Sequence, residues 1–230
     1  SLLNIFNGTD MLIAAHCEDQ ETIKNNIEKY KQKYKGADDI PVSAHPSIRS
    51  VPACYASSEL AVRLAKIAGA RLHILHVSTA KELQLFSDEP LANKNITAEA
   101  CVAHLLFTLT HYNSLGARIK CNPAVKRKTD REALRAAVNS GLIDVIATDH
   151  APHLLNEKEG GALKAMSGMP MIQFSLVSML ELVDEGVFSL ETVVQKMCHA
   201  PARIYGICQR GYIREGYQAD LVLVRPNSPW

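Results

Sequence analysis

Residues 145–153 constrain the fold of this chain more than any other stretch. The apolar run Val145–Ala147 leads directly into Asp149 and His153, which is typical of a buried strand in a parallel sheet that carries polar groups at its carboxyl end. In barrels of alternating strands and helices, the chemistry lies at these strand ends. An aspartate there can bind a metal or act as a general base, and a histidine four residues later can hold a substrate anion. The alternative is a strand followed by an ordinary polar loop.

Two earlier segments have the same design, because each is an apolar run that ends in a histidine. They are Met11–His16 and Arg71–His76. Imidazole and carboxylate groups are ligands that Zn²⁺ takes in hydrolytic sites. We therefore predict that His16, His76 and Asp149 meet at one end of a sheet, with donor nitrogens of the two histidines within about 4 Å. His73 lies three residues before His76, so alternation along the strand places it on the opposite face.

Helical periodicity fills the stretches between these strands. The predicted helices cover residues 20–34, 51–68, 101–110, 129–139, 172–184 and 190–199, with one more short strand over 95–98. Residues Thr129–Glu132 have the pattern of a capping box that opens a helix. This alternation predicts an α/β fold in which helices cover parallel strands.

Composition predicts a cytoplasmic protein that binds neither nucleic acid nor membrane. The formal net charge of the 230 residues is +1, which offers no general attraction to anionic partners. No apolar run approaches the roughly 20 residues of a membrane span, and the start has no signal-peptide pattern. The six cysteines contain no C-x-x-C pair, so we expect reduced, mostly structural thiols.

Four motifs, in order along the chain, resemble the cyclic-amidohydrolase group of the amidohydrolase superfamily, and the dihydroorotases most of all. They are Ala15–Asp19, Leu75–Thr79, Lys120–Pro123 and Thr148–His153. The tail Gly211–Val224 resembles the strand pair with which these enzymes return to a small β domain. The Thr148–His153 motif is the most specific of the set, whereas the tail pattern is common to the whole superfamily.

The resemblance implies a metal-dependent (β/α)₈ TIM barrel, of which this chain supplies the C-terminal half. Only four strand–helix units are found, whereas a closed barrel has eight, and the family's His-x-His pair is absent. We therefore expect residues 1–206 to form strands five to eight of a partial barrel, and residues 207–230 to form β strands of a truncated accessory domain. Open sheet edges would expose Met11–Ala15 and Val145–Ala147 to water, which favours a homo-oligomer or another partner chain.

The resemblance also implies roles for individual residues. His16 and His76 would bind one metal of a binuclear zinc pair, and Asp149 would bind the other and act as the base. His153 would hold the carboxylate of the substrate, and Asn122 would contact its pyrimidine ring. Backbone groups at Gly168 and Pro170 would also face the substrate. The implied activity is the reversible closure of N-carbamoyl-L-aspartate to dihydroorotate in pyrimidine biosynthesis. The 230-residue chain alone is expected to be inactive and to hold no metal or one loosely bound ion.

Two other functions remain open from the sequence. One is another cyclic amidase, of the allantoinase or hydantoinase type, although hydantoinase substrates lack the carboxylate that His153 would bind. The other is a non-catalytic scaffold that keeps the fold. Ala103 stands where the family usually has the first of two adjacent histidines, so the retained His104 is expected to be structural. Residues 154–161 are interpreted either as a mobile lid or as a passive surface loop.

Overall fold

Four parallel strands form a single sheet in the computed structural model, which describes residues 1–225. They are β1 (Ile13–Ala15), β2 (Leu72–Ile74), β3 (Ile96–Cys101) and β4 (Val145–Ala147). Their spatial order follows their order in the chain, and every neighbouring pair is parallel. The carboxyl ends of all four strands therefore lie at the same edge of the sheet, as the sequence predicted.

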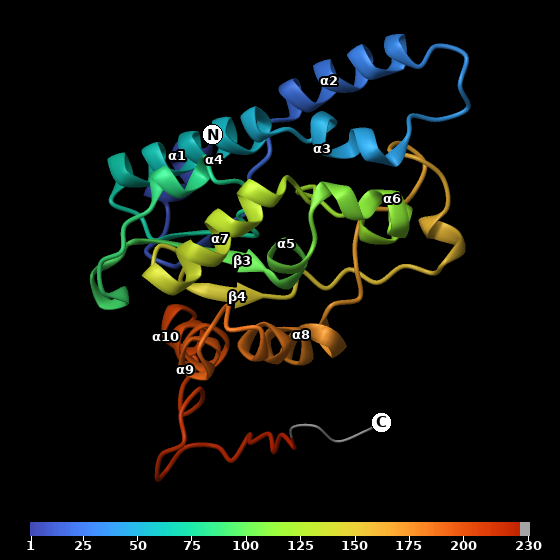
Figure 1. Cartoon of the computed structure of the whole chain (residues 1–230). Coiled ribbons are helices and arrows are strands. Elements are labelled where there is room, and N and C mark those ends of the chain that lie inside the picture. The colour runs from blue at the N-terminus through green and yellow to red at the C-terminus, as the bar shows by residue number, and fades with distance from the viewer. Residues whose placement is uncertain (226–230) are drawn as a thin grey trace.

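Helices lie on both sides of this sheet (Figure 1). The helices of the amino-terminal part are α1 (Leu2–Asn7), α2 (Gln20–Lys33), α3 (His45–Ile48) and α4 (Val51–Ala68). Those that follow β3 and β4 are α5 (Val102–Leu106), α6 (Tyr112–Leu115), α7 (Lys128–Ser140), α8 (Ile172–Asp184), α9 (Leu190–Val194) and α10 (Ala200–Ile204). In Figure 1, α2 and α4 lie above the strands labelled β3 and β4, and α8, α9 and α10 lie below them.

Local signals explain the helix boundaries that were predicted correctly. Helix α4 begins after Ser50, whose side chain accepts a hydrogen bond from the Ala53 amide, the usual N-cap arrangement. It ends at Gly69, which adopts the left-handed conformation with φ of 64°, where glycine carries no side-chain penalty. Helix α8 has the predicted bounds.

Three predicted helix details are wrong. Thr129–Glu132 is not a capping box, because α7 begins at Lys128 and the Asp130 carboxylate accepts the Arg127 amide instead. The helix expected over 101–110 is shorter in the structure. Helix α5 covers only Val102–Leu106, because Cys101 still belongs to β3 and a separate 3₁₀ turn covers Leu109–His111. The helix expected over 190–199 changes to a π-helical turn, η7, over Gln195–His199. Pro201 follows this turn and has no amide hydrogen to donate to a preceding carbonyl.

The expected exposure of β4 is also wrong. Val145 and Ile146 are only 3% and 4% exposed, because Val145 packs with Ala200 and Ile204 of α10. Strand β1 fits the expectation better, since Met11 is 74% exposed and the strand residues are at most half-buried.

The tail differs from the expected pair of strands. Residues 207–225 contain no strand, and Ile213 and Leu223 are 87% and 97% exposed. A strand exists only through hydrogen bonds to a neighbour, and none lies beside this segment within the described residues. Residues 226–230 lie outside the described part, and the division at residue 206 stays a prediction. Among the described residues, no helix is long and apolar enough to cross a membrane.

A buried ion pair fixes the amino ends of β3 and β4. The Lys94 ammonium lies 2.8 Å from Asp144 Oδ1 and also donates to the Gly141 carbonyl. The other oxygen of Asp144 accepts the Ala98 amide at 3.0 Å. The side chains of Lys94 and Asp144 are 1% and 5% exposed, so each charge depends on the other for compensation.

We predict that Asp144→Asn lowers the free energy of unfolding by about 3–5 kcal/mol, because it leaves the Lys94 ammonium buried and unpaired. Urea denaturation at neutral pH measures this change. Asp184→Asn, at the exposed carboxyl end of α8, is the matched control and should change stability by less than about 0.5 kcal/mol. Equal unfolding midpoints for the two variants would contradict the role given to the pair.

Candidate active site

Two imidazoles meet at the carboxyl edge of the sheet, directly after β1 and β2. Nδ1 of His16 lies 2.8 Å from Nε2 of His76, and the rings stand at 75° to each other. This distance confirms the prediction that the two nitrogens lie within about 4 Å. The parallel register that pairs Ala15 with Ile74 places the two histidines on neighbouring strand ends.

Hydrogen bonding fixes the protons on this histidine pair. Nε2 of His16 lies 3.2 Å from the buried Glu18 carboxylate, so it carries a hydrogen and donates. In the neutral ring, Nδ1 of His16 then accepts from Nε2 of His76. This arrangement leaves Nδ1 of His76 as a buried lone pair that has no partner, and Glu18 Oε1 is buried without one as well.

Glu18 is ionised in this environment. Burial alone would raise the pKa of Glu18, but the hydrogen bond from His16 and the charges of Arg49 and Lys126 outweigh it and lower the pKa below 4.5. The Arg49 guanidinium pairs directly with the same carboxylate. Burial and the neighbouring His16 imidazole lower the pKa of His76, although the carboxylates of Asp149 and Glu99 act in the opposite direction. His76 is therefore held as the neutral ring, the form that can offer a lone pair.

Glu99 holds the His76 backbone in an uncommon conformation. The sequence analysis assigned no role to Glu99. His76 has φ of 38°, in the left-handed region that few residues other than glycine adopt. One oxygen of Glu99 accepts the His76 amide at 3.2 Å, and the other lies 3.2 Å from Nε2 of His73. A glutamate inside an apolar strand was the available signal, since a buried carboxylate needs donors.

Asp149 lies near the histidine pair but does not join it. The Asp149 carboxylate is close enough to act on the pKa of His76, in the upward direction. The Asp149 backbone also has a positive φ, of 45°. Its side chain lines a small void together with Cys101, His104 and Cys121. The described residues contain no group of three or more histidine, cysteine, aspartate or glutamate side chains that could hold a metal ion. The three-ligand group stays a prediction, of which the histidine pair alone is in place.

The donor set nevertheless fits a divalent metal. Two imidazoles and a nearby carboxylate are suitable ligands for Zn²⁺, and Nδ1 of His16 and Nε2 of His76 face each other. A move of the His76 hydrogen from Nε2 to the unpartnered Nδ1 would free both facing nitrogens to bind an ion. In a tetrahedral zinc site the two nitrogens would stand roughly 3.3 Å apart. The observed 2.8 Å separation therefore differs from that geometry by only a side-chain adjustment.

Asn122 is among the residues that line another hollow, and the Asn122–Pro123 peptide bond is cis. Its side-chain oxygen is buried without a hydrogen-bond partner. The hollow is also lined by Arg49, Lys120 and Ser167. Both cationic groups already have partners within the protein, because Arg49 pairs with Glu18 and the Lys120 ammonium donates to the Ala165 carbonyl.

A hydrogen bond between His153 and Ser167 brings His153 close to Gly168. Nε2 of His153 donates to the Ser167 carbonyl at 3.1 Å, and Nδ1 lies 3.6 Å from Glu157. Gly168 has φ of 142°, and a Cβ there would lie 2.4 Å from the Ala151 carbonyl, so only glycine fits. Its amide donates to the Lys120 carbonyl at 2.8 Å, whereas Pro170 is exposed. The Gly168 amide is thus used within the protein.

The remaining buried histidines near the site are structural. His104 donates to the Pro123 carbonyl at 2.9 Å, and burial lowers its pKa to about 3. His45 donates to the Cys121 carbonyl at 2.9 Å, with the same effect of burial on its pKa. His73 is fully buried between Thr97 and Glu99. All six cysteines are free.

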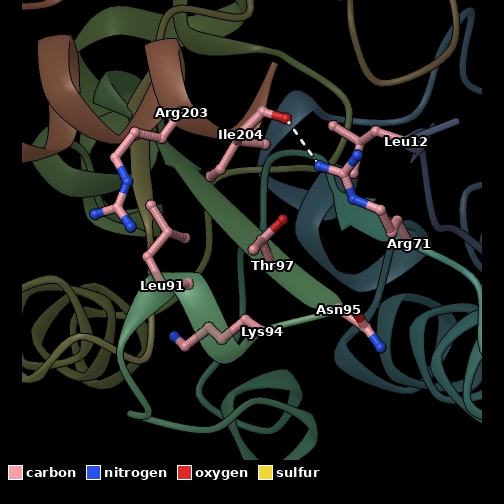
Figure 2. Close-up of a pocket in the computed structure, with 9 residues that line it drawn as sticks. Leu12, Arg71, Leu91, Lys94, Asn95, Thr97, Arg203 and Ile204 are labelled. Atoms are coloured by element: carbon pink, nitrogen blue, oxygen red, sulfur yellow. Dashed lines mark hydrogen bonds between the residues drawn. The ribbon is translucent and has the colours of Figure 1, made fainter. Parts of the chain in front are cut away.

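A second hollow opens at the amino ends of the strands, away from the histidine pair. Figure 2 shows Arg71, which precedes β2, donating to the Ile204 carbonyl, and Thr97 on strand β3. The donor and acceptor atoms are 3.3 Å apart. No histidine or carboxylate lines this hollow. The chemistry of parallel α/β sheets belongs to the opposite edge, so the histidine edge is the candidate active site.

Comparison with known proteins identifies relatives along the whole chain. The amidohydrolase family model matches residues 2–230. A dihydroorotase from Geobacter metallireducens is 30% identical over 99% of this chain and 52% of its own length. An allantoinase from Bacillus velezensis is 30% identical over 94% of this chain and 47% of its own. The L-hydantoinase (dihydropyrimidinase) structure from Arthrobacter aurescens superposes with a TM-score of 0.85 at 27% identity, over 94% of this chain and 48% of that one. The chain thus spans about half the length of the curated relatives it matches.

We predict that Glu18→Gln destabilises the fold in a pH-dependent way. The lowered pKa of Glu18 means that its ionised form stabilises the fold above about pH 4.5, and this contribution is lost as the pH falls through the folded-state value. Unfolding by urea should therefore show a deficit of about 1–3 kcal/mol at pH 7 that shrinks toward zero in acid. Glu89→Gln, at an exposed position, is the control and should match the parent. A deficit that stays constant with pH would exclude this explanation.

Proposed function

This chain belongs to the amidohydrolase family, and we propose that it acts in a dihydroorotase, which reversibly closes N-carbamoyl-L-aspartate to dihydroorotate in pyrimidine biosynthesis. The observation that carries the proposal is the approach of His16 and His76 to 2.8 Å at the carboxyl edge of the sheet. The substrate class is supported by the dihydroorotases among its relatives.

The family is generally metal-dependent, and we infer that the metal here is zinc, in a binuclear centre. His16 and His76 would hold one ion, and Asp149 would hold the other. When bound, the metal polarises the scissile carbonyl and makes water acidic enough to ionise near neutral pH. Glu18 would orient His16 by accepting its Nε2 hydrogen, as carboxylates behind metal-binding histidines do.

The residues of this chain supply the remaining chemistry. The Asp149 carboxylate takes a proton from the attacking water and delivers it to the departing amide nitrogen. His153, positioned by its Nε2 hydrogen bond to Ser167, would present its other ring nitrogen to the substrate carboxylate, a charge-assisted contact. The unpartnered oxygen of Asn122 would accept a ring N–H, and the backbone at Gly168 and Pro170 would border the ring.

We further propose that the four strands are the fifth to eighth of an eight-stranded barrel. The strand order β1-β2-β3-β4 and the match to about half of the Arthrobacter aurescens hydantoinase support half of such a barrel, and the resemblance of the strand-end motifs assigns it to the second half. Residues 1–206 would belong to the barrel and 207–230 to an accessory β domain. The half-exposed edge strand β1 favours a homo-oligomer or another partner chain. We also propose that the protein is cytoplasmic.

A second candidate is a cyclic amidase of another specificity. The allantoinase from Bacillus velezensis and the hydantoinase from Arthrobacter aurescens are the observations that favour it. The two candidates differ in the carboxylate that only a dihydroorotase substrate presents to His153.

We predict that the protein, as its gene encodes it, cyclises N-carbamoyl-L-aspartate and leaves hydantoin and allantoin unchanged. Asp149→Ala should abolish turnover, because proton transfer at that carboxylate is lost. His153→Ala should raise KM for dihydroorotate by roughly tenfold or more, because a charge-assisted contact is removed. Chromatographic measurement of each compound before and after incubation gives the turnover. Hydrolysis of allantoin with no dihydroorotate turnover would favour the second candidate, and an unchanged KM in His153→Ala would exclude the role of His153.

A further inference from the structure

The segment 156–168, between β4 and α8, is held by two partly buried charged side chains, Asp39 at residues 161–164 and Lys158 at residues 166–168. It contains one short 3₁₀ turn, Asn156–Lys158, and carries the Ser167 carbonyl that holds His153. We propose that Asp39 and Lys158 are positioning residues, which fix this segment and through it set His153 and the hollow around Asn122. The structural part of this inference stands alone, and its consequence for substrate binding rests on the proposed function.

Asp39 accepts hydrogen bonds from three backbone amides of the segment. Oδ2 accepts from Gly161 at 2.7 Å and from Lys164 at 3.1 Å, and Oδ1 accepts from Leu163 at 3.2 Å. These donors lie more than 120 residues from Asp39 in the chain. Burial opposes ionisation, but the backbone hydrogen bonds outweigh it and lower the pKa of Asp39 below 3.8. A carboxylate only accepts hydrogen bonds, so it suits a group of amides.

Close packing reinforces this contact. The Ala162 amide donates to the Ile40 carbonyl at 2.7 Å, and Ala162 is buried with Ile23 and Ile48 in a small apolar cluster. A Cβ on Gly161 would lie 2.0 Å from the Ile40 carbonyl oxygen, so the two backbones touch. The segment is therefore seated on residues 39–40 by both polar and apolar contacts.

Lys158 donates hydrogen bonds to three backbone carbonyls. Its ammonium donates to Met166 and Gly168, both at 2.8 Å, and to Lys120 at 2.9 Å. Met166 and Gly168 flank Ser167, so Lys158 fixes the peptide groups on either side of the carbonyl that holds His153. The bond to the Lys120 carbonyl joins the segment to the Lys120–Pro123 motif, which contains Asn122. One lysine thus sets the relative position of the two proposed substrate contacts.

Hydrogen exchange and nitrogen NMR of the protein as its gene encodes it test the clamp without substrate. In Asp39→Asn, one acceptor oxygen becomes an NH₂ donor that faces amide donors. We expect exchange at residues 161–164 to accelerate by at least about tenfold, and the His153 Nε2 hydrogen to lose its fixed, protected signal. Asp38→Asn makes the same change at the neighbouring exposed position and should leave both readouts unchanged. Parent-like exchange in Asp39→Asn would overturn the proposal.

Gly161→Ala provides a second route to the same result without changing the charge of Asp39, because its methyl group would lie 2.0 Å from the Ile40 carbonyl and 2.9 Å from Cγ of Asp39, and would push the segment away from both. It should accelerate the same amides, and it decides the question if Asp39→Asn fails to fold. Exchange unchanged in Gly161→Ala would also overturn the clamp, and fast exchange with an undisturbed His153 signal would overturn its positioning role.

Enzyme kinetics add the functional consequence. In Asp39→Asn we expect KM for dihydroorotate to rise by roughly fivefold or more while kcat changes by less than about twofold, the pattern of lost binding without lost chemistry. A loosened segment with an unchanged KM would contradict the effect on substrate binding. A parent protein that does not turn over dihydroorotate would refute the proposed function alone, because the exchange and NMR results need no substrate.

Discussion

The parallel pairing of β1 with β2 is the constraint on which the rest of the site depends. It aligns Ala15 with Ile74, so the residues that follow these strands leave the sheet side by side. The imidazoles of His16 and His76 then meet at 2.8 Å, and a shift of one residue would turn one of them to the opposite face. The apolar core beneath, which includes Leu72 and Ile74, fixes that register. Burial of plain hydrocarbon thus determines the position of the polar chemistry.

Charged groups then hold each polar element of the site in place. Glu18 orients His16, and Glu99 holds the backbone of His76 in its positive-φ conformation. Asp39 and Lys158 do the same for the segment that carries Ser167. The buried carboxylates of Glu18 and Glu99 each contact two donors, which offsets part of the cost of burying a charge. Asp39 and Lys158 are only partly buried, and each contacts at least three backbone groups.

The sequence predicted the parts of this structure that depend on short-range patterns. Apolar runs that end in His16, His76 and Asp149 located three strand ends, and Ser50 and Gly69 marked the bounds of α4. It did not predict long-range partners, because nothing near Asp39 indicates contact with amides 120 residues away. The predicted exposure of Val145, which α10 in fact covers, and the predicted strands in 207–225, which are absent, were wrong for the same reason. Both features depend on which element becomes a neighbour.

Zinc binding to the histidine pair tests the central claim most directly. Equilibrium dialysis followed by elemental analysis, on the protein as its gene encodes it, measures this without reference to activity. His16→Ala and His76→Ala should each weaken zinc binding by at least about tenfold, whereas His199→Gln, which lies in η7 away from the strand ends, should bind as the parent does. Zinc affinity that is the same in the parent and in both alanine variants would contradict the account.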